Sequence, residues 1–259
     1  MNKLILIISA LYLQGCTSYA HITYEFAQLG EKPVILYDVE EKDIAMQVSK
    51  SLADDISIVE KRQFVAFKDI DALKVYIFSS KDRYSFFSGS TPKARASAIK
   101  NEVYISPIIN ERIETLEGIL IHELSHVHLR QHIGTWRYWA EVPGWFHEGL
   151  AVEVSAGAGA EKVSGREAIA AIKMGKYFTP REESNLFGHK YASNYDLEHQ
   201  MYYRQCGLFV RYLINQNPEA FKNSYLALIK GAEFKNIWVL YYGKSVPELW
   251  REYLEYVLA

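Results

Sequence analysis

The chain has 259 residues, of which 49% are hydrophobic and 23% are charged. This composition is that of an ordinary globular protein long enough to bury a large core, so we expect one domain or two subdomains that share a cleft. The formal net charge is −2 at pH 7. That value excludes the strongly basic surface of nucleic-acid-binding proteins, and we expect no nucleic acid among the partners.

The first fifteen residues are predicted to be a signal peptide and not part of the fold. Lys3 supplies a positive charge, and residues 4–13 form an apolar run that is too short to span a bilayer. The processed chain would then begin at or shortly after residue 16.

Residues 13–16 read Leu-Gln-Gly-Cys, which resembles a bacterial lipobox. The resemblance implies cleavage before Cys16 and lipidation of that cysteine. Thr17 follows it, which favours sorting to the outer membrane, so we expect a lipid-anchored protein of the bacterial cell envelope that faces the periplasm. Ordinary signal-peptide cleavage after Ala20 is the alternative.

Residues 16–133 are predicted to form an α/β subdomain. Runs of β-branched and aromatic residues predict strands at 33–37 and 74–78, and an amphipathic pattern predicts a helix at 44–52. Residues 101–106 alternate polar and apolar side chains, as a half-buried strand does. This strand either lines a cleft or is a plain edge strand.

The central motif follows that strand. Residues 111–121 carry apolar side chains at helical spacing and lead into His122-Glu123-Leu-Ser-His126. Residues four apart lie on the same face of a helix, so both imidazoles can bind one metal ion, and Glu123 can reach a water on that ion. This is the spacing of a zinc-dependent hydrolase. A surface helix with two solvated histidines is the alternative.

Two residues compete for the role of third ligand. Residues 145–151 contain W-x-x-E-G-x-A, which resembles the glutamate helix of gluzincin peptidases and implies Glu148 as the ligand. His132 stands where the third histidine of a metzincin would be, but Leu129 replaces the glycine that bends such a chain. On a straight helix His132 lies about 9 Å beyond His126. Glu141 and Glu153 are the fallback carboxylates.

The gluzincin resemblance implies further roles. It implies a bound Zn²⁺ ion, Glu123 as the general base, and a tyrosine that donates a hydrogen bond to the oxyanion. The run at 203–213 resembles the helix that carries this tyrosine, which assigns Tyr203, with Tyr202 left open. In such peptidases the strand before the motif helix pairs with the substrate, which gives Val103 and Tyr104 as substrate-binding residues.

The remaining chain, 134–259, is predicted to be mainly helical. The expected helices are residues 166–174, 202–215, 221–229 and 246–258. We expect a helix stop at Gly134, a flexible loop at residues 155–160, and a buried, inert Cys206. His128, His132 and His147 are expected to be solvated. The aromatic residues between the ligands form either core or a specificity pocket: Trp136, Tyr138, Trp139 and Trp145.

The sequence therefore predicts an α+β, zincin-like fold. Its N-terminal mixed sheet carries the active-site helix, and a helical subdomain carries the glutamate helix. The predicted function is zinc-dependent hydrolysis of peptide bonds in a peptide or protein substrate. The aminopeptidase signature G-x-M-E-N is absent, so we expect an endopeptidase. The alternative is a non-catalytic lipoprotein that uses a zincin fold as a binding scaffold in the cell envelope.

Overall fold

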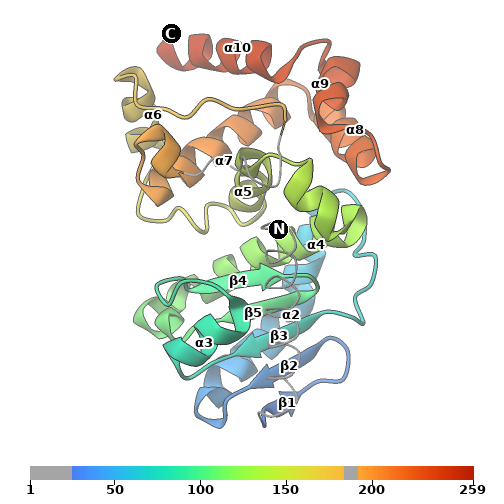
Figure 1. Cartoon of the computed structure of the whole chain (residues 1–259), viewed down its shortest axis with the longest axis vertical. Coiled ribbons are helices and arrows are strands. Elements are labelled where there is room, and N and C mark those ends of the chain that lie inside the picture. The colour runs from blue at the N-terminus through green and yellow to red at the C-terminus, as the bar shows by residue number, and fades with distance from the viewer. Residues whose placement is uncertain (1–24, 184–191) are drawn as a thin grey trace, which may run out of the picture.

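A computed structural model describes residues 25–183 and 192–259. Cys16 and the alternative cleavage site after Ala20 lie outside these residues. The molecule is elongated, with an α/β half at the bottom of Figure 1 and a helical half at the top. Helix α4 (Leu116–Ala140) lies where the two halves meet.

Five strands and nine α-helices make up the described residues. The strands are β1 (Ala27–Leu29), β2 (Val34–Tyr37), β3 (Lys74–Ile77), β4 (Ala96–Ile99) and β5 (Glu102–Ile105). The other α-helices are α2 (Lys42–Arg62), α3 (Lys81–Ser88), α5 (Gly144–Val154), α6 (Gly165–Lys173), α7 (His199–Gln216), α8 (Pro218–Ile229), α9 (Phe234–Tyr242) and α10 (Val246–Leu258). Short 3₁₀ helices are η1 (Val39–Glu41), η2 (Pro107–Thr115) and η3 (Ala192–Tyr195).

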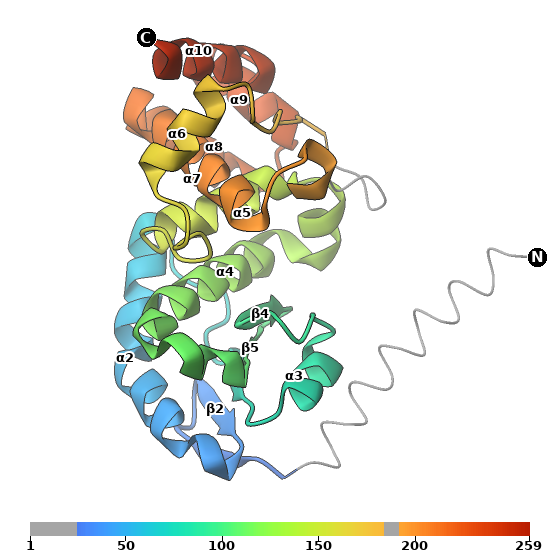
Figure 2. The ribbon, with the colours of Figure 1, turned by 90° about the vertical axis from the view of Figure 1, so that its left-hand side faces the viewer.

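The strands form one mixed sheet in the order β1-β2-β3-β5-β4. β2, β3 and β5 are parallel, and β1 and β4 run antiparallel to their neighbours at the two edges. Figure 2 shows α2 and α3 on opposite sides of the strands. The edge strand β4 is the one that lies next to α4 (Figure 1).

Side chains of the inner strands are buried on both faces of the sheet. Val75 and Val103 belong to the main core with α2 and α4, whereas Tyr76 and Tyr104 pack into a second, aromatic core under α3. β5 was expected to be half-buried and to meet substrate. Val103 and Tyr104 are instead 0% and 2% exposed, and β5 is paired on both sides, so they cannot add a peptide as a new strand.

Helix α4 begins later than expected and runs past its expected end. Residues 107–115 are a 3₁₀ helix, and the α-helix starts at Leu116. Gly134 has φ +80° and ψ 154°, which breaks the helix, but the chain resumes a helical path to Ala140. A left-handed φ of this kind favours glycine. The predicted division of the chain at residue 134 coincides with this break and remains a prediction.

Two glycines allow α5 and α7 to pack closely. A Cβ on Gly149 would lie 2.6 Å from the carbonyl oxygen of Cys206, and one on Gly207 would lie 2.5 Å from Cγ1 of Val152. Larger residues would therefore separate the helices. Gly149 directly follows Glu148, so the close crossing of α5 and α7 determines how near Glu148 lies to α4. Cys206, at the same crossing, is buried as predicted.

The α+β class is confirmed in its coarse form, as a mixed sheet in a mostly helical chain. The predicted strands and helices are present; α2, α7 and α8 are longer than the patterns indicated, whereas α6 and α10 have the predicted length. Four elements were not predicted: β1, α3, β4 and α9. In the described parts of the chain, none of the helices combines the length and hydropathy that a membrane-spanning segment needs.

Candidate active site

Three side chains from two helices converge on one point. Nε2 of His122 and Nε2 of His126 are 3.2 Å apart, and Oε2 of Glu148 lies 3.5 and 3.4 Å from them. The two histidines are one turn apart on α4, and Glu148 comes from α5. Both imidazoles are buried and the carboxylate is largely buried. Within the described residues, these three form the one cluster with the geometry of a metal site.

The hydrogen bonds of His122 show which nitrogen faces the cluster. Its Nδ1 lies 3.1 Å from the carbonyl oxygen of Ala158. A carbonyl can only accept, so Nδ1 carries a proton, and in the neutral ring Nε2 presents its lone pair. Gly159 makes this contact possible: a Cβ there would lie 2.9 Å from Cε1 of His122, and its φ is +82°.

The donor set fits Zn²⁺. Two ligands at about 2.0–2.1 Å from a tetrahedral zinc ion are about 3.3–3.4 Å apart, close to the separations observed here. Burial lowers the pKa of His126 to about 4, so this ring is neutral at pH 7. Burial opposes ionisation of Glu148, but His126 and the adjacent histidines outweigh it and hold its pKa well below the usual value. Burial opposes protonation of His122, but the hydrogen bond to Glu148 and the charges of Glu123 and Glu148 outweigh it and raise its pKa. Metal binding must displace that proton, and two imidazoles that are then neutral, with one carboxylate, leave room for a fourth ligand.

A tyrosine hydroxyl contacts the ring nitrogen of His126 that points away from the cluster. The hydroxyl of Tyr138 lies 2.9 Å from Nδ1 of His126 and 3.1 Å from Nδ1 of His147. If His126 uses Nε2 for a metal, its Nδ1 must carry the proton and donate to Tyr138, which then donates to His147. His147 was predicted to be exposed. It is 4% exposed, because the crossing of α5 with α4 turns it inward.

Glu123 lies beside the three-residue cluster in the same cleft. It is 9% exposed. Burial raises its pKa to about 7; the charge of His122 opposes this rise, that of Glu148 adds to it, and that of Arg130 opposes it. A carboxylate with a pKa near neutrality suits a general base, because it can accept a proton and release it again.

Tyr203 is the tyrosine that reaches the cluster. Its ring stacks on His122, with centroids 6.1 Å apart and planes at 13°, and it lines the cleft. Burial and the nearby charge of Glu148 raise its pKa well above the usual value, so the phenol stays protonated. Tyr202, the open alternative, packs instead against Phe178 and Tyr195.

The cleft in which these groups lie has a volume of about 750 Å³. One wall is residues 94–99, which include the edge strand β4, and the floor is α4. The start of α7, Glu148, Gly159 and part of the segment 88–93 line the rest. β4 is one of the two edge strands of the sheet and the one that borders the cleft, so its outer edge is where an extended peptide in the cleft could join the sheet.

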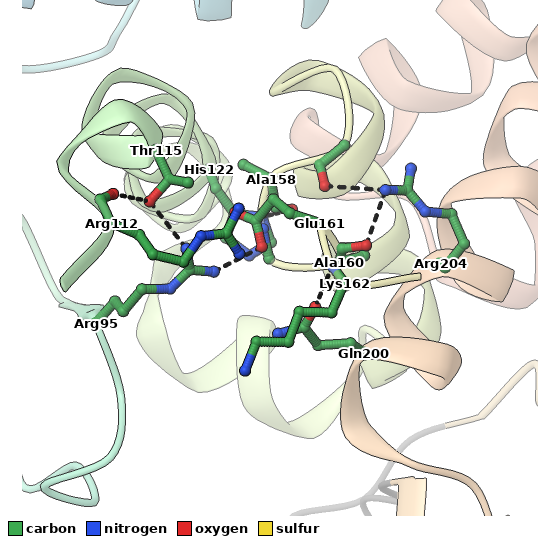
Figure 3. Close-up of polar contacts among 12 residues, drawn as sticks. Arg95, Arg112, Thr115, His122, Ala158, Ala160, Glu161, Lys162, Gln200 and Arg204 are labelled. Atoms are coloured by element: carbon green, nitrogen blue, oxygen red, sulfur yellow. Dashed lines mark hydrogen bonds and ion pairs between the residues drawn. The ribbon is translucent and has the colours of Figure 1, made fainter. Parts of the chain in front are cut away.

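The loop at residues 155–160, expected to be flexible, is tied down at several points. Arg204 donates to the carbonyl oxygens of residues 157, 160 and 163 at 2.7–3.3 Å. Arg95, the residue before β4, bridges Thr115 and Glu161, as Figure 3 shows. The loop that holds His122 is thus anchored to both walls of the cleft.

The other candidate ligands lie elsewhere. Nε2 of His132 is bonded to the carbonyl of Ala66 at 3.0 Å, and Glu141 and Glu153 pair with arginines. His128 was predicted to be solvated. It is 0% exposed, because its Nδ1 meets the hydroxyl of Tyr225 and its Nε2 the carbonyl of Val65. All four of these side chains have structural partners.

Comparison with known proteins finds similarity in structure only. No protein-family model and no curated protein match the sequence. Native yeast leukotriene A4 hydrolase superposes with a TM-score of 0.55 and 11% identity, over 86% of this chain and 37% of that one. The shared property is the fold. The yeast enzyme with bestatin, and a second native structure from Saccharomyces cerevisiae, give a TM-score of 0.49 at 12% identity. They cover 89% and 88% of this chain but 36% and 38% of their own.

The chain therefore spans little more than a third of the length of these hydrolases. At 11% identity, the likeness establishes architecture and not activity. The functional conclusion must come from the site.

Proposed function

We propose that the protein is a zinc-dependent peptidase of the gluzincin type, acting as an endopeptidase. The observation that carries the proposal is the convergence of His122, His126 and Glu148 in one cleft that also contains Glu123. The fold similarity to a hydrolase and the W-x-x-E-G-x-A resemblance support it. An intact Glu123 argues against a pure binding scaffold, because a scaffold needs no base.

In this proposal His122, His126 and Glu148 hold the zinc ion. When bound, zinc would lower the pKa of a water molecule and polarise the scissile carbonyl. Glu123 accepts the proton of the attacking water and passes it to the leaving amine. Its pKa near 7 fits both transfers.

Tyr203 has the complementary role. Its protonated hydroxyl donates a hydrogen bond to the oxygen on which negative charge develops. The free edge of β4 pairs with the backbone of the substrate and holds it in an extended form. A cleft bordered by a strand edge, with no signature for gripping an amino terminus, supports cleavage within a chain.

We also propose that lipidation of Cys16 anchors the mature protein to the envelope membrane, with its site in the periplasm. The support is the lipobox-like sequence alone. The substrate would then be a peptide or protein of that compartment.

The test uses purified protein and a library of unstructured peptides. We expect cleavage at internal bonds, loss of cleavage after removal of metal with a chelator, and recovery on addition of about one equivalent of zinc. Zinc binding without any cleavage would contradict the proposal and favour the scaffold. Cleavage that survives chelation would contradict the metal mechanism.

A further inference from the structure

Arg130 is a buried cation in the cleft to which the proposed mechanism gives no role. It follows His126 by four residues, so it lies on the same face of α4, about 6 Å further along the helix axis. It lines the same cleft as Glu123 and is 5% exposed. The face of α4 that carries His122 and His126 therefore also carries the guanidinium of Arg130.

The contacts of Arg130 orient the guanidinium without neutralising it. The guanidinium carbon, Cζ, lies 4.4 Å from the ring centroid of Tyr138 and 5.8 Å from that of Trp139. One Nη donates to the carbonyl oxygen of Lys100 at 3.4 Å, a long hydrogen bond, and its buried Nε has no hydrogen-bond partner. Among residues 25–183 and 192–259, it makes no ion pair with a carboxylate.

A buried arginine without a counter-ion is unfavourable, because its charge has lost its hydration. A carboxylate satisfies such a group well, since the planar guanidinium can donate two parallel hydrogen bonds to it. The aromatic rings fix the plane of the guanidinium, so little conformational entropy is lost when an anion binds. A carboxylate entering the cleft would supply the missing counter-ion.

The position of Arg130 indicates where this carboxylate belongs on a peptide. Lys100, its backbone contact, directly follows β4. The guanidinium therefore lies at one end of the strand edge that an extended substrate would follow. Its distance of about 6 Å from His126 along the helix corresponds to about two residues of extended chain.

We propose that Arg130 forms a binding subsite for a substrate carboxylate within about two residues of the cleaved bond. The proposal rests on the proposed peptidase function and names its substrate class: peptides with an acidic side chain at that place. A terminal carboxylate at that place is the other source of this group, and a preference for it would mean removal of a short C-terminal piece and not internal cleavage. Arg130 then determines specificity and takes no part in proton transfer.

The experiment measures charge selectivity in two ways. First, kcat/KM is compared for peptides that differ only by Asp or Asn, or by Glu or Gln, at each position flanking the cleaved bond, and by a C-terminal acid or amide. Second, binding of the same fluorescently labelled peptides to zinc-loaded Glu123→Gln protein is measured by anisotropy. The side-chain and terminal series distinguish the two sources of the carboxylate.

We expect one acidic peptide to exceed its neutral partner by about tenfold to a hundredfold in both assays, the range for hydrogen bonds to a charged group. Arg130→Gln should abolish the preference, Arg130→Glu should reverse it, and Arg130→Lys should keep part of it. Arg112→Gln removes an equal charge from a partly exposed arginine outside the cleft and should leave the preference unchanged.

Equal losses for acidic and neutral peptides in Arg130→Gln would overturn the proposal and assign Arg130 a structural role beside Tyr138. A wild-type protein without any acidic preference would overturn it as well. If no peptide is hydrolysed, the peptidase proposal fails, but the binding assay still tests Arg130. Melting temperatures of the variants show whether each is folded.

Discussion

Replacing Tyr138 by phenylalanine tests whether His126 is a metal ligand held in place by its neighbour. The hydroxyl lies 2.9 Å from Nδ1 of His126 and 3.1 Å from Nδ1 of His147, and the residue is 1% exposed. Loss of such a partner of a metal ligand costs about 10–100-fold in metal affinity, or about 1.4–2.7 kcal/mol.

Tyr225→Phe is the matched control. Tyr225 is also 1% exposed, and its hydroxyl bonds Nδ1 of His128 at 3.0 Å, a histidine on the same helix that faces away from the cleft. Each substitution leaves a buried histidine with an unsatisfied group, which costs about 1–3 kcal/mol of stability. Only Tyr138→Phe should also weaken zinc binding.

The assay is zinc titration against a competing chelating dye, with urea unfolding of the metal-free proteins to compare stability. Tyr138→Phe should bind zinc about 10–100-fold more weakly than the wild type, and Tyr225→Phe should match the wild type. If both variants bind zinc equally well, or both weaken it equally, the reasoning about Tyr138 is wrong.

Three further predictions follow from single residues. Glu148→Ala should lose zinc in the dye titration, whereas His132→Ala should keep it, because His132 is bonded to backbone away from the cluster; the reverse result would support a metzincin-like site. Asp55 is 0% exposed, and its burial raises its pKa to about 6 despite a hydrogen bond from Ser51. Because the unfolded carboxyl titrates near pH 4, the ionised folded form is destabilised above about pH 6, and this cost disappears below about pH 4. Asp55→Asn should therefore stabilise the protein by about 1–3 kcal/mol at pH 7.5 and much less at pH 4; a gain that does not change with pH in urea unfolding would contradict this. Cys16→Ser should release the protein from membranes or block its processing, and unchanged fractionation and mass would favour cleavage after Ala20.

Local spacing made the centre of the site predictable from sequence. His122 and His126 share a helical face by geometry alone, and the motif around Glu148 located the third member of the cluster. Gly149 explains why that motif is informative, since the close crossing of α5 and α7 needs a residue without a side chain.

The partners of these residues were not predictable, because they depend on how the chain returns in space. Tyr138 reaches His126 only because the chain bends at Gly134 and resumes a helix. His128 was misjudged for a related reason: a histidine pattern on a helix does not reveal that α4 is buried on every side between residues 119 and 130. Arg130 follows His126 at helical spacing, and that signal could have placed it in the cleft.

The strand that borders the cleft, β4, could not be predicted from the sequence. Its sequence, Ala-Ser-Ala-Ile, has little of the β-branched and aromatic content that identifies a strand. Residues 102–105 have a more strand-like sequence and were therefore predicted to be the substrate-binding strand, although they form the inner strand β5. Sheet order is a property of tertiary packing, so Val103 and Tyr104 were assigned a role that the position of β4 suits better.

The most direct measurement is the turnover of one cleaved peptide by zinc-loaded Glu123→Gln beside the wild type. The amide keeps the shape of the side chain and removes its ability to accept a proton. We predict about one bound zinc in both proteins and a loss of about a hundredfold or more in kcat, the contribution of a general base. Undiminished turnover at equal zinc content would contradict the assignment of Glu123 as the base and, with it, the proposed mechanism.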